Sequence, residues 1–218
     1  MGHRYHASSN DGLVDNHANA EIIKSSRVIH AMKATDRAKY LVRHEGEEIE
    51  ASVAYRDGPK QIDHEQTISA PHMHAYAFQH AADAIDGVEQ PRILEVDAGS
   101  GYLTACLGRL GKTVVDNISS ADSDLLGQGV VTIEQADGWH GLPTAAPFHF
   151  IHVGAAAVET PKALMDQLAD GGCLLVPVGA PDAHQALMEI QRNGETFTER
   201  KLVGVKFVPL VREEFAEL

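Results

Sequence analysis

Cysteine, aromatic residues and basic side chains are all scarce in this sequence of 218 residues. The two cysteines, Cys106 and Cys173, lie within apolar periodic segments, so we expect buried free thiols in a reducing compartment and no disulfide framework. Lysine and arginine together number 18 against 31 acidic residues, which gives a formal charge of −13. A phosphate backbone requires a basic protein face, so this charge argues against non-specific binding of nucleic acid.

Long apolar runs are absent as well, because no stretch approaches the roughly 18 residues that a membrane-spanning helix requires. The first six residues, Met-Gly-His-Arg-Tyr-His, lack the apolar core of a signal peptide. We therefore expect a cytoplasmic protein without membrane attachment. The 13 histidines are scattered and match no His-Glu-x-x-His or mixed Cys/His pattern, so we expect no metal site.

The composition that remains is that of a globular protein, with 44% apolar and 22% charged residues. The length fits one domain over residues 1–218, with a helical part at 1–90, a core at 91–180 and C-terminal strands at 181–218. From residue 92 onward, predicted strands and helices alternate. This alternation predicts an α/β fold, in which helices cover both faces of a mostly parallel sheet and ligands bind at the carboxyl ends of its strands.

Apolar runs and turn residues define the elements of this alternation. We predict strands at residues 92–96, 113–115, 130–135, 148–153 and 173–178, helices at 102–110 and 161–168, and a closing β-meander at 186–191, 197–202 and 205–210. Thr160 is the expected N-cap of the second helix. Residues 170–172, Asp-Gly-Gly, predict a turn before the last parallel strand.

The N-terminal part is predicted to be helical over residues 16–42 in more than one piece, with Ser25 or Ser26 capping a helix that begins at Arg27. Residues 43–65 are rich in charge and contain Gly-Pro, which predicts a connecting loop. Pro71 begins the next helix, with Ser69 as a candidate N-cap.

Residues 97–101, Asp-Ala-Gly-Ser-Gly, form a glycine-rich turn between the first strand and the following helix (the 97–101 turn). Glycines in such a turn permit φ > 0 and let backbone N–H groups approach a nucleotide-like ligand. Here Asp97 stands where the first glycine is expected, whereas Gly99 and Gly101 remain. Taken alone, this remnant fits an ordinary strand-to-helix turn equally well.

A second motif, Thr-Ile-Ser-Ala-Pro-His-Met-His-Ala at residues 67–75 (the 67–75 segment), resembles the signature of protein-L-isoaspartate O-methyltransferases. The sequence is similar to that family over nearly its whole length. Further matching segments are residues 34–40, the 97–101 turn, and residues 136–138, 146–147, 151–157, 163–168, 177–179 and 204–210. The resemblance implies a class I S-adenosylmethionine-dependent methyltransferase, a Rossmann-like sheet with an N-terminal helical extension and a C-terminal β-meander.

The resemblance also implies a monomer that uses S-adenosylmethionine, yields S-adenosylhomocysteine and acts on isoaspartyl-containing proteins and peptides. Ser69 matches the family's assigned active-site residue, and His152, Val153 and Gly154 match residues beside the substrate. In the implied cofactor site, Asp116 holds the ribose and Asp137-Gly138 borders the adenine. The full set of implied cofactor-binding residues is Gln66, Thr67, Ile68, Ser69, His74, Glu95, Asp97, Gly99, Gly101, Asp116, Asp137 and Gly138.

The most important departure from the family pattern is Asp97, which replaces a glycine. At a position with φ > 0, such a side chain costs on the order of 1–3 kcal/mol. The carboxylate would also repel that of the cofactor's methionine moiety, so we expect weakened cofactor binding. Alternatively, the carboxylate faces the sulfonium and ammonium groups of the cofactor, which would offset part of the cost.

Two further departures lie elsewhere in the implied site. The region between the 97–101 turn and residue 130 is short for the family. Asp116 is therefore either the ribose ligand, which we favour slightly, or part of a helix tail with the second strand deleted. Val211 replaces a threonine, so one hydroxyl near the site is missing.

The implied chemistry requires little of the protein's side chains. Transfer of a methyl group from a sulfonium to an ionised carboxylate is an in-line displacement that needs alignment and no general base. Ser69 is then a positioning hydroxyl or simply a helix cap, and His74 is a site residue or an ordinary core histidine. His152 can act through its backbone alone. Trp139 either stacks on the adenine or covers the sheet edge.

Three functions compete at this point. The first is an isoaspartyl methyltransferase, and the second is a cofactor-impaired, non-catalytic relative that acts as a binding protein, which Asp97, Val211 and the short region favour. The third, a nicotinamide oxidoreductase, leaves the 67–75 segment unexplained.

Overall fold

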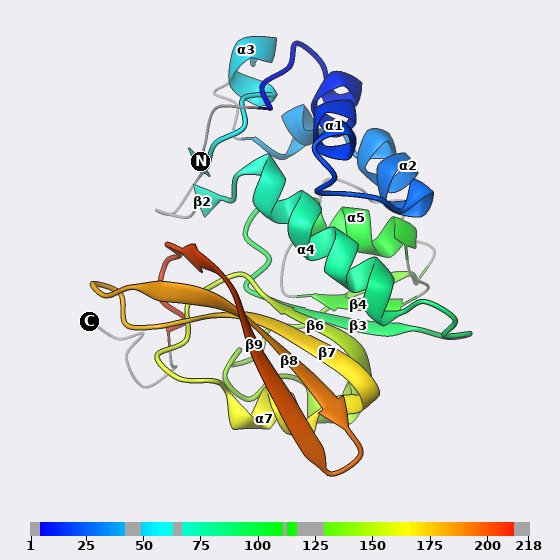
Figure 1. The fold of residues 1–218 in the computed structure, drawn as a ribbon, viewed down its shortest axis with the longest axis vertical. Coiled ribbons are helices and arrows are strands. Elements are labelled where there is room, and N and C mark those ends of the chain that lie inside the picture. The colour runs from blue at the N-terminus through cyan, green and yellow to red at the C-terminus, as the bar shows by residue number, and fades with distance from the viewer. Residues whose placement is uncertain (1–4, 42–48, 63–66, 111–112, 117–128, 212–218) are drawn as a thin grey trace.

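The computed structural model describes residues 5–41, 49–62, 67–110, 113–116 and 129–211 (Figure 1). Its centre is a seven-stranded sheet of order β5-β4-β3-β6-β7-β8-β9. The strands are β3 (Arg92–Val96), β4 (Thr113–Asp116), β5 (Val131–Ile133), β6 (Phe148–Val153), β7 (Leu168–Val178), β8 (Gln185–Asn193) and β9 (Thr196–Val205). Strands β3 to β7 pair in parallel, whereas β8 and β9 pair antiparallel at one edge. The predicted α/β class with a mostly parallel sheet is confirmed.

Helices lie on both faces of this sheet (Figure 1). One face carries α4 (Pro71–Ala84) and α5 (Tyr102–Leu110), with α1 (Asn10–Asn19) and α2 (Ser26–Ala34) packed beyond them, and the other face carries α7 (Lys162–Asp166). Side chains alternate between the faces, because Ile93 belongs to the core under α4 and α5, whereas Leu94 and Val96 belong to the core that contains Leu164 of α7. The alternation holds β3 between two apolar layers.

The N-terminal part contains more short elements than the sequence predicts. The predicted loop at residues 43–65 holds α3 (Ala51–Ala54) and β1 (Lys60–Gln61), and β1 pairs antiparallel with β2 (Thr67–Ile68). Helix α1 begins at Asn10, before the predicted start of the helical region, and a 3₁₀ turn, η1 (Arg37–Tyr40), follows α2. Elements of two to four residues are too short to produce a recognisable apolar period.

Several predicted ends and caps are wrong. Ala70, not Ser69, occupies the N-cap position of α4, and Pro161, not Thr160, precedes α7; neither position makes a side-chain cap hydrogen bond. Strand β7 begins at Leu168, so the predicted turn at residues 170–172 is an irregularity within a strand. The predicted strand at 205–210 is reduced to a single bridge between Pro209 and Ala156.

Both cysteines are buried and free, as the apolar pattern predicts. Burial raises the pKa of each thiol to about 12, which keeps both protonated at neutral pH. Among the described residues, the helices are too short or too polar to span a bilayer.

Candidate functional site

A pocket lies where the predicted motifs meet, at the carboxyl ends of β3 and β6. Strand β3 continues into the 97–101 turn, and β6 continues into Gly154. The 67–75 segment approaches from the N-terminal part through β2 and the start of α4. Nine predicted site residues line the pocket: Thr67, Ile68, Ser69, His74, Glu95, Asp97, Gly99, His152 and Gly154. Ala98, Ser100 and Val208 complete the lining and were not predicted.

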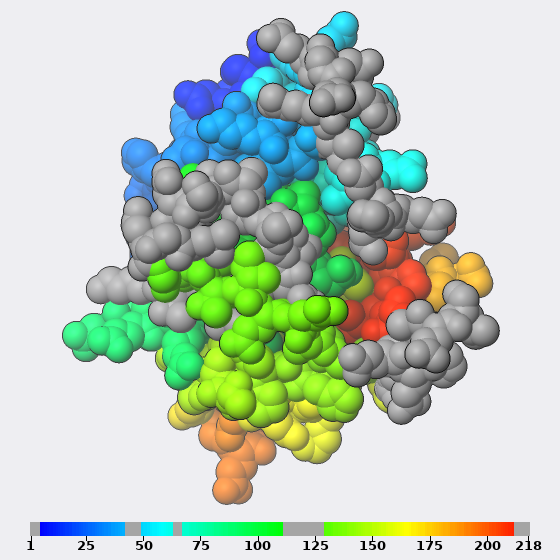
Figure 2. Space-filling view, turned by 180° about the vertical axis from the view of Figure 1, so that it is seen from behind, coloured from blue at the N-terminus to red at the C-terminus, as the bar shows by residue number. Residues whose placement is uncertain are grey.

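The C-terminal residues reach this pocket by folding back across the end of β6. Ala156 N donates to Val208 O at 2.7 Å, and Leu210 N donates to Ala156 O at 2.8 Å. Figure 2 shows the C-terminal part of the chain (red) beside the green middle part, with the blue N-terminal part above. Val208 is thereby fixed at the pocket edge, whereas Val211, beyond it, is exposed.

The 97–101 turn adopts the strained backbone that its family pattern implies. Asp97 has φ of 58°, Gly99 of 56° and Gly101 of 76°. Glycine adopts such angles freely, but an L side chain does so at a cost, which aspartate bears better than most residues. The condition under which Asp97 was predicted to be strained is therefore met.

Gly154 is required by the close approach of two chain segments. Gly154 N donates to Val96 O at 2.8 Å, and a Cβ built on Gly154 would lie well inside the contact distance of Asp97 O. Only a residue without a side chain can therefore follow β6 at this point. The contact couples Gly154 directly to the backbone of the 97–101 turn.

Acidic groups dominate the floor of the pocket. Glu95 is buried and accepts a hydrogen bond from the Thr104 hydroxyl at 2.8 Å. His152 Nδ1 lies 3.5 Å from Glu95 Oε1 and has no hydrogen-bond partner among the described residues. Burial and the neighbouring Glu95 raise the pKa of Asp97, which His152 lowers only in part. Two carboxyl groups in one small pocket favour a cationic ligand.

His74 has the opposite environment. Its ring packs on Tyr102 with ring centroids 5.1 Å apart, and its Nδ1 lies 3.4 Å from an Arg37 nitrogen. Burial and the positive charge of Arg37 hold the pKa of His74 well below its ordinary 6.5. His74 is thus a neutral pocket residue at cellular pH.

Protein stability should depend on pH through His74. Because its folded-state pKa lies below the unfolded value, the unfolded chain binds more protons below about pH 6.5, and stability falls on acidification through that range. In His74→Gln this contribution is lost, so the variant should gain stability relative to the wild type between about pH 7.5 and pH 5.5. Urea unfolding at both pH values measures the difference, and parallel curves for the two proteins would contradict the assignment.

Other predicted residues lie apart from the pocket lining. Asp137 accepts a hydrogen bond from Trp139 N and contacts the His140 ring, while Gly138 packs against Val96. Gly101 begins the turn into α5, and Val153 is fully buried in the sheet. Asp116 ends β4, which pairs with β3. The second strand is therefore present, and the alternative in which it is deleted is wrong. Gln66 lies outside the described residues.

Trp139 has a structural place in this arrangement. Its indole is buried in the core beneath β3 and β6, and its Nε1–H donates to Leu210 O at 3.1 Å. The hydrogen bond ties the C-terminal residues to the core beside the central strands, so Trp139 does not cover an edge strand of the sheet, and stacking on the adenine stays a prediction.

Two buried charged residues were not predicted as part of the site. Arg37 donates to Ser69 O at 2.9 Å, and Asp57 accepts from His72 N at 3.0 Å. Arg37 belongs to a segment, residues 34–40, that resembles the family, so its presence there was a usable signal. Asp57 lies in the predicted loop at residues 43–65, where no sequence pattern indicated a site residue.

Comparison with known proteins shows which family this chain resembles in sequence and fold. A family model described as protein-L-isoaspartate(D-aspartate) O-methyltransferase matches residues 8–215. The chain is 36% identical over 230 residues to the protein-L-isoaspartate O-methyltransferase of Caenorhabditis elegans, covering 98% of this chain and 97% of the relative. It is 39% identical over 198 residues to the protein of the same name from Anaeromyxobacter dehalogenans, covering 86% and 90%. A solved β-aspartate methyltransferase from Plasmodium falciparum, in complex with S-adenosyl-L-homocysteine, is 28% identical, with a TM-score of 0.73 over 93% of this chain and 98% of that one.

Proposed function

Because this chain belongs to the protein-L-isoaspartate(D-aspartate) O-methyltransferase family, we propose that it methylates the α-carboxylate of L-isoaspartyl residues in damaged proteins, with S-adenosylmethionine as methyl donor. The observation that carries this proposal is the shared pocket. Ser69 and His74 of the 67–75 segment face Gly99 of the 97–101 turn at the carboxyl ends of the parallel strands.

The residues present fit the cofactor. A Cβ on Gly99 would meet only Thr67 O, 4.0 Å away, so backbone lines a gap between the turn and the 67–75 segment. Glu95 supplies negative charge for a sulfonium or an ammonium group. The ribose is assigned to Asp116 from the end of β4, as in other sheets of this type. The remaining proposed cofactor residues are Gln66, Thr67, Ile68, Ser69, His74, Gly99, Gly101, Asp137 and Gly138.

The protein's task in the reaction is alignment. S-adenosylmethionine supplies a methyl group on sulfur; a carboxylate oxygen forms the new C–O bond while the C–S bond breaks and its electrons pass to sulfur. No base is needed, since the carboxylate is already ionised. Ser69 positions the isoaspartyl carboxylate, and His152, Val153 and Gly154 line the peptide side. The methyl ester then closes to a succinimide with loss of methanol, and hydrolysis returns some normal aspartate.

Two measurements test this function in sequence. Isothermal calorimetry should detect S-adenosylmethionine binding, and no binding at millimolar ligand would contradict the enzyme. Methanol release from an isoaspartyl peptide, with the matching aspartyl peptide as control, then tests the substrate. Equal release from both peptides would contradict the isoaspartyl assignment.

A second candidate function is a non-catalytic binding protein. The positive φ and buried carboxyl group of Asp97 favour it, because both oppose cofactor binding at the 97–101 turn. Isoaspartyl-peptide binding without any cofactor binding would select this candidate.

We also propose a single-domain monomer in a reducing cytoplasm. The two buried thiols support the compartment, and the acidic net charge accords with protein rather than nucleic-acid partners. Light scattering tests the oligomeric state, and a particle of twice the chain mass would contradict the monomer.

A further inference from the structure

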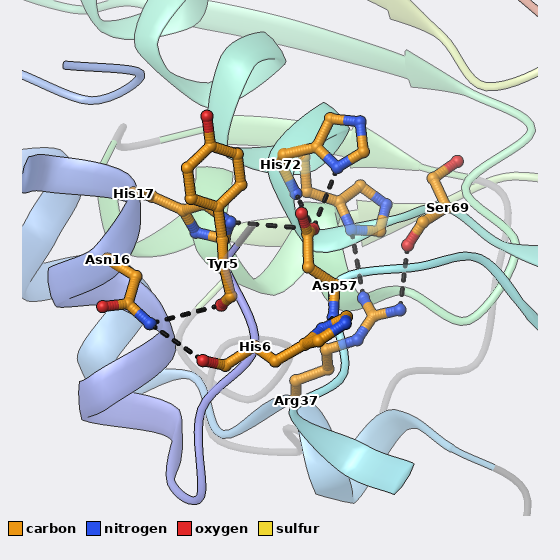
Figure 3. Close-up of polar contacts among 9 residues, drawn as sticks. Tyr5, His6, Asn16, His17, Arg37, Asp57, Ser69 and His72 are labelled. Carbon is orange, nitrogen blue, oxygen red and sulfur yellow. Dashed lines mark hydrogen bonds and ion pairs between the residues drawn. The ribbon is translucent and has the colours of Figure 1, made fainter. Parts of the chain in front are cut away.

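Two buried charged residues contact the 67–75 segment and are not part of the pocket lining. Arg37 comes from η1 and Asp57 from the residues after α3, and both side chains reach the turn that leads into α4 (Figure 3). Both are almost fully buried. Burying a charge is unfavourable unless it makes specific contacts, so the contacts of these two residues indicate their purpose.

Arg37 makes two contacts that bear on the pocket. One guanidinium nitrogen donates to Ser69 O at 2.9 Å, and another lies 3.4 Å from His74 Nδ1. Burial lowers the pKa of Arg37 only to about 10, so the group is charged at cellular pH and has donors alone. His74 Nδ1 must therefore accept, and the proton of the neutral ring resides on Nε2.

Asp57 supplies the helix cap that Ala70 lacks. Its Oδ1 accepts from His72 N at 3.0 Å and lies 2.9 Å from His72 Nδ1, while His17 Nε2 lies 3.7 Å away (Figure 3). Burial alone would raise the pKa of Asp57, but the contacts with His17 and His72 outweigh it and hold that pKa below its ordinary range. Asp57 thus fixes the start of α4 without touching His74.

We propose that Arg37 is a positioning residue for methyl transfer: it selects the Nε2–H tautomer of His74, so that the ring presents a hydrogen-bond donor to a carboxylate oxygen in the pocket. This inference rests on the proposed function. Two carboxylates qualify, that of the cofactor's methionine moiety and the isoaspartyl α-carboxylate. His152, Arg37 and His72 are the charged or titratable groups whose charge acts on the His74 ring, and the Tyr102 ring packs against it.

The first test observes the wild-type protein in the absence of substrate. Long-range nitrogen–proton correlation spectra of protein with labelled histidine report the tautomer of each ring, and the spectrum of His74→Gln assigns the His74 signals. We expect the Nε2–H pattern, without titration near the ordinary histidine pKa of about 6.5. An Nδ1–H pattern, or titration near the ordinary pKa, would overturn the proposal whether or not the protein is active.

The second test uses Arg37→Gln, which removes the charge, and Arg37→Lys, which keeps it. In Arg37→Gln the tautomer of His74 is no longer fixed, because an amide can donate to Nδ1 or accept from it, so kcat/KM should be lowered most at neutral pH. Acidification that protonates the ring restores the Nε2–H donor, so the loss should shrink as the pH falls, a dependence that the wild type lacks. Arg37→Lys, which presents only donors to Nδ1, should suppress that dependence. If the loss appears in calorimetric affinity for S-adenosylmethionine, His74 serves the cofactor; if it appears in peptide KM alone, it serves the substrate.

Asp57→Asn is the matched control, because it loosens the same turn without contacting His74. It should lower kcat/KM with a smaller pH dependence than Arg37→Gln, because Asp57 acts on the His74 ring only indirectly, through its contact with His72. The same pH dependence in Asp57→Asn and Arg37→Gln would show a merely structural role for Arg37 and overturn the proposal. Thermal unfolding verifies that each variant is folded, and if Arg37→Gln is not, the wild-type spectra decide.

Discussion

Replacing Gly154 by alanine should lower the free energy of unfolding by about 3 kcal/mol and abolish measurable cofactor binding. The added Cβ would overlap Asp97 O, and a backbone atom cannot rotate away as a side chain does. Either the end of β6 or the 97–101 turn must move. The turn is the part of the site that approaches the cofactor, so the loss of binding should exceed what the loss of stability explains.

Gly204→Ala is the matched control for this substitution. Gly204 lies in β9, and a Cβ there would meet nothing within 4 Å. Alanine is favoured over glycine in a strand by roughly 0.5–1 kcal/mol, so the control should be neutral or slightly stabilising. Urea unfolding and calorimetry on both variants measure the contrast. Intact cofactor binding by folded Gly154→Ala would show that the turn tolerates displacement.

The centre of the sheet could be predicted because β3 and β6 bury most of their residues. The ranges of β3, α5 and β6 follow from mostly apolar runs bounded by Pro91, the 97–101 turn and Pro147. Short elements such as α3 and β1 could not, since they depend on partners distant in sequence. The cap of α4 shows the same limit: the local choice was Ser69, but the hydrogen bond comes from Asp57, fifteen residues away.

The site residues also differ in whether a local motif predicts them. Residues within one motif, such as Thr67, Ser69 and Gly99, were assigned to the pocket from the sequence. Val208 lines the pocket and Arg37 contacts Ser69 O only through the packing of other elements. Both lie in segments that resemble the family, but no local pattern places them at the site. Asp97 lies between these cases, because the motif indicated that its backbone conformation mattered and the structure supplied the angle.

Asp97→Gly should stabilise the cofactor-free protein by about 1 kcal/mol and raise affinity for S-adenosylmethionine about tenfold. The backbone strain at φ of 58° disappears, and so does a buried carboxyl group. Asp97→Asn separates the two causes, since it keeps the Cβ and removes only the charge. If Asn gains as much affinity as Gly, repulsion of the cofactor's carboxylate dominates; if only Gly gains, strain and close approach dominate.

The pH dependence and the choice of ligand make this prediction decisive. Because the folded-state pKa of Asp97 is raised, its charge is unfavourable at neutral pH and the penalty is relieved on acidification. The stability advantage of Asp97→Asn should therefore be largest at neutral pH and shrink as the pH falls.

S-adenosylhomocysteine keeps the carboxylate but lacks the sulfonium charge, so it distinguishes repulsion from attraction. Should Asp97→Asn weaken binding of S-adenosylmethionine and not of S-adenosylhomocysteine, the carboxylate faces the sulfonium, and the residue that replaces glycine is then a ligand that favours substrate over product.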